Sequence, residues 1–132
     1  MDILDIGCGN GLLWVKEKEI LPEISARTFQ RILANHMLYH IEDSERKKLL
    51  EIISNMLSDD GKFIASTIGK NHMKELFDLA NEYNKSVRAP EWFSSGFNLE
   101  NGMEQLKKFF SKVTVFHHDN NLLVTDWRAI YD

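Results

Sequence analysis

The chain has 132 residues, of which 43% are hydrophobic and 27% are charged, a composition typical of one globular domain rather than a disordered chain. Its formal charge of -4 argues against nucleic-acid binding, which usually needs a basic face. The single cysteine, Cys8, excludes an intramolecular disulfide and a multi-cysteine zinc site. Because the sequence shows no apolar run that could span a bilayer and no secretory signal, we expect a single cytoplasmic domain over residues 1–132.

The first half of the chain begins with a predicted short, buried strand at residues 3–6. Three glycines follow it, and the next residues, as far as Pro22, have helical character. A short apolar run that ends at Ala34 favours a second buried strand, although periodicity alone also allows a helix there. The polar and aromatic residues 35–40 are expected to form a loop or a short helical turn.

The second half shows helical periodicity and turn signals in alternation. They predict helices at 43–57, 71–85 and 98–110, a turn at 58–61, a strand at 62–67 and an aromatic loop at 91–97. Residues 113–117 and 122–125 are expected to form a final antiparallel hairpin. Because strands alternate with helices, the sequence predicts an α/β fold with about five strands, a mostly parallel sheet and helices on both faces.

The segment D-I-G-C-G-N-G at residues 5–11 carries the strongest chemical signal. Glycine permits a sharp turn from strand to helix and lets the backbone approach a ligand closely. The first amides of the following helix are unpaired and lie at the positive end of its dipole, so a polar or anionic part of a cofactor can bind there. A dinucleotide-binding fingerprint would require a third glycine at the position of Leu12.

This D-x-G-x-G-x-G pattern resembles the first motif of class I S-adenosylmethionine-dependent methyltransferases of the type 11 kind. Residues 29–43, with N-H-M-L-Y-H, look like that family's fourth strand and pocket loop, and residues 57–63 look like the turn into its fifth strand, without the usual proline. The resemblance implies a Rossmann-like fold and S-adenosyl-L-methionine as cofactor. It assigns cofactor binding to Asp5, Gly7, Cys8, Gly9, Asn10, Gly11, Asn35 and His36, and the substrate pocket to Tyr39 and His40.

The resemblance also implies a truncated sheet. In the family, two strands and two helices separate the glycine loop from the fourth strand, and the second strand ends in an acid that binds the ribose. Only 17 residues separate Gly11 from Phe29, which leaves room for one helix and a connection. We therefore expect the second and third strands, and half of the adenosine site, to be missing. The first strand then becomes a sheet edge, which predicts a homodimer through that edge.

Two further groups of residues have alternative interpretations. His36 and His40 have the spacing of a metal-binding pair on a helix, but Met37 replaces the glutamate of the zincin motif, so no metal site is predicted. A histidine or Tyr39 could serve as a base in the substrate pocket, or these residues could simply pack the loop against the sheet. The aromatic segment that begins at Trp92 is interpreted as an interface or a satellite core rather than a substrate lid.

The first functional hypothesis is methyl transfer from S-adenosylmethionine to an unidentified acceptor. The protein would mainly align the two reactants, and no catalytic residue is assigned. The alternative is a degenerate, non-catalytic domain retained for binding or dimerisation. A nicotinamide-dependent oxidoreductase is a weaker third hypothesis, because the third glycine of that fingerprint is absent.

Overall fold

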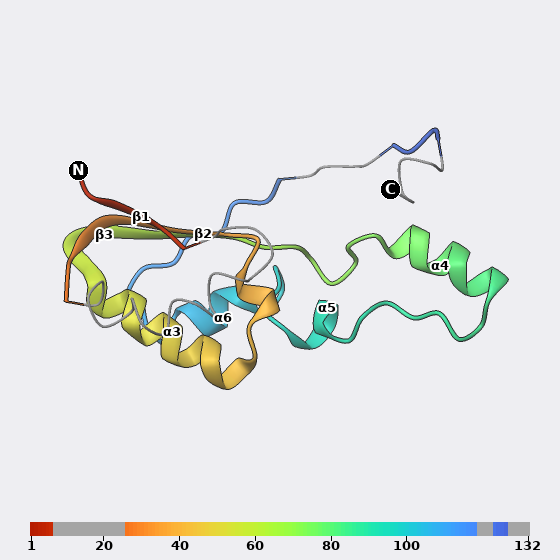
Figure 1. The fold of residues 1–132 in the computed structure, drawn as a ribbon, viewed down its shortest axis with the longest axis horizontal. Coiled ribbons are helices and arrows are strands. Elements are labelled where there is room, and N and C mark those ends of the chain that lie inside the picture. Colours follow the sequence, from red (N-terminus) through yellow and green to blue (C-terminus); the bar gives the residue numbers. More distant parts are fainter. Residues whose placement is uncertain (7–25, 119–122, 127–132) are drawn as a thin grey trace.

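The computed structural model describes residues 1–6, 26–118 and 123–126, and its centre is a parallel sheet (Figure 1). The strands are β1 (Ile3–Asp5), β2 (Phe29–Asn35) and β3 (Leu57–Ser66). They lie in the order β1-β2-β3, and both neighbouring pairs are parallel. The three predicted strands are therefore confirmed, and the first two lie side by side as the truncated sheet requires.

The helices among the described residues all come after β2 in the chain, and two of them precede β3. They are the 3₁₀ turn η1 (Leu38–His40), α3 (Asp43–Met56), α4 (Lys74–Tyr83), α5 (Trp92–Ser95) and α6 (Gly102–Leu106). The first two helices predicted for the second half are confirmed as α3 and α4. The third is shorter than predicted, and the aromatic loop contains the single turn α5.

The predicted turn at residues 58–61 lies inside β3 rather than before it. Phe29 is in register with Leu57, yet Arg31 is in register with Lys62, so the extra residues loop out of the pairing. Gly61 allows this tight course, because a Cβ at that position would lie 2.8 Å from the carbonyl oxygen of Ser58. The turn signal was correct locally, but strand pairing continues across it.

The core lies on one face of the sheet. Register aligns Leu4, Ile32 and Phe63 across the three strands, and this row faces the core. Helix α3 contributes Leu49, Leu50 and Ile53 to the same cluster, and α3 and α6 lie on one side of the sheet in Figure 1.

The opposite face of the sheet is open in the part of the chain that the structure describes. This face carries Ile3 and Ile64, whose exposed fractions are 51% and 47%. Among the described helices, α3 and α6 pack on the core face. The helix predicted between the glycines and Pro22 lies outside the described residues, so the expectation of helices on both faces stays a prediction.

The expected antiparallel hairpin is also wrong within the described residues. Residues 113–118 and 123–126 form no strand, and the segment runs as extended chain in Figure 1. Phe116 and Leu123 are each 87% exposed, so these segments bury too little apolar surface to offset the entropy of ordering them. The sheet consequently has three strands in the described ranges instead of about five. No described helix is long and apolar enough to cross a membrane.

Candidate functional site

The carboxyl ends of the parallel strands meet at one edge of the sheet. Asp5 is in register with Leu33, and the Ile6 amide donates to the Leu33 carbonyl oxygen at 2.9 Å. Because side chains alternate along a strand, Asp5, Leu33 and Asn35 belong to the same face. Asp5 and Asn35, two of the predicted cofactor residues, are thus placed at the same edge and on the same face.

The backbone turns sharply just after Asn35. His36 has a φ of 50°, in the left-handed region that non-glycine residues adopt uncommonly. Its amide donates to the Ser66 carbonyl oxygen at 3.3 Å and to the Ser66 Oγ at 3.1 Å, and that hydroxyl donates to the Asn35 Oδ1 at 3.3 Å. Left-handed geometry of this kind costs about 1–3 kcal/mol and is common at functional sites, so the strain coincides with the predicted cofactor residues.

The two predicted substrate-pocket residues belong to an aromatic cluster. The Tyr39 and His40 ring centroids are 4.3 Å apart, and His36 contacts Tyr39 at 6.3 Å. Burial raises the pKa of Tyr39 above its usual value, which disfavours its phenolate as a base at neutral pH. The structure therefore brings three of the predicted site residues together, but it does not favour Tyr39 as a base.

Trp92 is the functional-site candidate that sequence reasoning missed. Its ring stacks on Tyr39 at 5.3 Å with an interplanar angle of 5°, and it lies 5.6 Å from the His40 ring. The aromatic segment was interpreted as an interface or satellite core, and its packing on η1 shows that it also borders the predicted substrate residues. Its exposed fraction of 37% leaves part of the ring open to solvent.

Helix α5, which carries Trp92, is held in place by a buried amide. The Asn98 side chain donates to the carbonyl oxygens of Phe93 and Ser94 at 3.0 and 3.1 Å. Its Oδ1 accepts from the amides of Glu100 and Asn101 at 3.1 and 3.0 Å. Every polar atom of the Asn98 side chain therefore makes a hydrogen bond. These bonds hold the single turn α5 in place and so position the Trp92 ring against Tyr39.

Arg46 fixes the other side of the cluster. It is only 2% exposed, and its Nη1 donates to the Ile41 carbonyl oxygen at 2.6 Å, just after η1. Its Nε donates to Gln105 Oε1 at 3.0 Å, which joins α3 to α6. An arginine in a charged helical stretch normally indicates a solvated face, so the sequence carries no signal for this role.

The glycine loop itself, which includes Gly7, Cys8, Gly9, Asn10 and Gly11, lies outside the described residues. No protein-family model and no curated protein matches the chain. The functional argument therefore depends on the sequence pattern and on the geometry at the carboxyl edge of the sheet.

Proposed function

We propose that this chain is a truncated, Rossmann-like S-adenosylmethionine-dependent methyltransferase domain that acts on an unidentified acceptor. The observation that carries the proposal is the placement of Asp5 and Asn35 on one face at the carboxyl edge of a parallel sheet. In open α/β sheets, ligands bind outside the carboxyl ends of the strands. The glycine pattern of residues 7–11 follows β1 directly, which is where such a cofactor loop belongs.

The residue types at this edge suit the cofactor. The Asp5 carboxylate can hold the ammonium group of S-adenosylmethionine, and backbone amides of residues 7–11 can hold its carboxylate. Asn35 offers an amide and His36 an imidazole for the remaining polar groups. When bound, the cofactor supplies a methyl group on a sulfonium, which reacts readily once the acceptor is aligned.

The aromatic cluster forms the acceptor side of the proposed site. Tyr39 and Trp92 present a rigid apolar wall, and His40 adds a polar group beside it. Excluding water and holding the acceptor close to the methyl group is the main contribution that the protein must make. The expected loss of half of the adenosine site predicts weak cofactor affinity.

Calorimetric titration with S-adenosylmethionine and S-adenosylhomocysteine tests the proposal. Asp5→Asn should weaken binding about tenfold, because it removes a charged hydrogen-bond acceptor for the ammonium group. Asp60→Asn is the matched control, since Asp60 is an exposed residue of the 58–61 turn. The proposal fails if neither ligand binds at millimolar concentration, or if both variants change the affinity equally.

A second candidate function is a non-catalytic dimerisation module. It is favoured by the position of β1 at the edge of the described sheet and by the half-exposed side chain of Ile3 on that strand. A homodimer through this edge would be detected by sedimentation at tens of micromolar, and Ile3→Lys should shift it toward monomer. A wild-type monomer under those conditions contradicts this candidate.

A further inference from the structure

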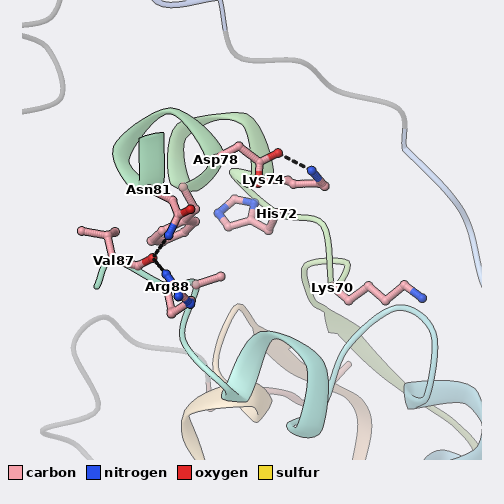
Figure 2. Close-up of a pocket in the computed structure, with 9 residues that line it drawn as sticks. Lys70, His72, Lys74, Asp78, Asn81, Val87 and Arg88 are labelled. Carbon is pink, nitrogen blue, oxygen red and sulfur yellow. Dashed lines mark hydrogen bonds and ion pairs between the residues drawn. The ribbon is translucent and has the colours of Figure 1, made fainter. Parts of the chain in front are cut away.

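A pocket of about 240 Å³ lies between α4 and the segments that flank it, away from the carboxyl edge of the sheet. Phe77 and Val87 give it apolar lining, whereas His72 and Arg88 give it polar lining. Figure 2 shows the His72 ring between the Lys74–Asp78 ion pair and Arg88. A concave site with an apolar part and a few polar groups is typical of small-ligand binding.

Arg88 is oriented by its own loop. Its Nη1 donates to the Val87 carbonyl oxygen at 2.7 Å and also to the carbonyl oxygen of Lys85. Asn81 donates to the same Val87 oxygen at 2.9 Å, which fixes the loop to α4 (Figure 2). Within the described part of the chain, no carboxylate pairs with Arg88, so the remaining N–H groups of the held guanidinium are free to bind a ligand.

The pocket has an excess of positive charge in a chain whose formal charge is -4. Lys74 is neutralised by Asp78, whereas Lys70 has no ion-pair partner among the described residues. Figure 2 shows the Lys70 side chain extended away from the other labelled residues, and its flexible stem allows the ammonium to turn toward the pocket that this residue lines. The Lys70 backbone amide donates to the Glu100 carboxylate at 3.0 Å, so a negative charge lies beside Lys70 and Arg88 is the main cation of the pocket.

We propose that this pocket binds an oxyanion, either a carboxylate or a phosphate, carried by a small ligand whose apolar part lies on Phe77 and Val87. A planar guanidinium matches both oxyanions through paired N–H groups. Arg88 is already held in place, so little conformational freedom is lost when the ligand binds.

Ring contacts connect the pocket with the aromatic cluster. His72 lies 5.6 Å from Phe93, Phe93 lies 4.4 Å from Trp92, and Trp92 stacks on Tyr39 at 5.3 Å. The pocket is therefore a ligand site of its own that borders the aromatic cluster through His72 and Phe93. The oxyanion proposal does not depend on the methyltransferase proposed above.

Nitrogen-15 NMR titration of the full chain tests the oxyanion site. The probes are inorganic phosphate, butyrate and, as an uncharged control, butanol. Signals of Arg88 and His72 should shift with at least one anion but not with butanol, and the anion that shifts them at the lower concentration identifies the preferred class. The proposal is overturned if neither anion shifts these signals, or if butanol shifts them as much as the anions do.

Charge variants distinguish anion binding in this pocket from a general electrostatic attraction of anions to the protein. Arg88→Gln and Lys70→Gln should each weaken anion binding about tenfold. Arg88→Gln could disturb the loop, because Arg88 donates to carbonyl oxygens within it. Lys70→Gln avoids this problem, because the Lys70 ammonium makes no hydrogen bond to a described residue. Lys112→Gln removes the same charge from an exposed position outside the pocket lining and should leave binding unchanged. Equal weakening in all three variants overturns the proposal.

The two proposals fail in different ways. Anion binding without cofactor binding supports the pocket and refutes the methyltransferase. Cofactor binding without anion binding refutes the pocket alone.

Discussion

Replacing Arg46 tests whether a buried arginine holds the candidate site together. Arg46→Met keeps most of the aliphatic stem but removes the guanidinium, whereas Arg46→Ala removes both. The guanidinium donates to the Ile41 carbonyl oxygen at 2.6 Å and to Gln105 Oε1 at 3.0 Å, in an environment where Arg46 is 2% exposed. Its Nη2 also donates to the Asp43 carboxylate at 3.0 Å. Arg46→Met leaves all three acceptors without their donor.

The magnitude follows from these contacts. A hydrogen bond to a charged group contributes about 1.5–3 kcal/mol, so the loss of the two buried bonds in Arg46→Met should cost about 3 kcal/mol, whereas the pair with the exposed Asp43 carboxylate adds less than about 1 kcal/mol. Arg46→Ala also removes two buried methylene groups, which adds about 1.5 kcal/mol. Against a typical free energy of unfolding of about 5–15 kcal/mol, either change is large.

Urea unfolding followed by circular dichroism measures both variants. With a slope of about 1.5 kcal/mol/M, Arg46→Met should lower the midpoint by about 2 M, and Arg46→Ala should lower it further. Lys48→Met is the matched control on α3, because Lys48 makes only an exposed ion pair with Glu45 and should change the free energy of unfolding by less than about 0.5 kcal/mol. If Arg46→Met and Lys48→Met unfold at the same urea concentration, the buried hydrogen bonds contribute nothing net and the reasoning is refuted.

Three further predictions concern packing and pH. Gly102→Ala should lower the melting temperature and cost about 1–3 kcal/mol, because a Cβ at that position would lie 2.9 Å from the buried Phe97 ring. The hydrogen bond from Lys47 lowers the pKa of Asp43 in the folded state. The ionised Asp43 carboxylate therefore contributes to stability above the unfolded pKa of about 4, and this contribution is lost as pH falls through the folded pKa. Urea midpoints measured between neutral and acidic pH will show the loss. Burial raises the pKa of Tyr39 in the folded state. The contribution of the protonated Tyr39 phenol to stability is therefore complete below the unfolded pKa of about 10 and is lost as pH rises through the folded pKa. The phenolate absorbance of Tyr39 should appear late in an alkaline titration.

Each of these predictions has a control. Gly69→Ala should be close to neutral, because its nearest contact is the exposed Glu100 side chain at 3.4 Å. Asp43→Asn should flatten the acid limb of the stability profile, and an unchanged limb would contradict the assignment. Tyr39→Phe should remove the late phenolate signal, and a late signal that persists in this variant would contradict the assignment.

Local patterns predicted the sheet strands and the longest helix well. The apolar run that ends at Ala34 became β2, and the helical period after Asp43 became α3, because burial of one face is encoded by neighbours in the chain. The same approach failed at residues 113–117, where alternation alone predicts a strand. Strand formation also needs a partner edge and enough buried area, and neither is visible in a short segment.

The sequence by itself indicated the α/β class and the position of Asp5 and Asn35 at strand ends, because apolar runs and the helical period are carried by each segment within itself. That the first two strands are neighbours was implied by the family resemblance and is seen in the structure. Only the tertiary structure decided that Arg46 is buried against Gln105, 59 residues away, and that Trp92 stacks on Tyr39. It also decided which face of the sheet packs against α3 and α6, because the free energy of such contacts depends on partners that lie far apart in the chain.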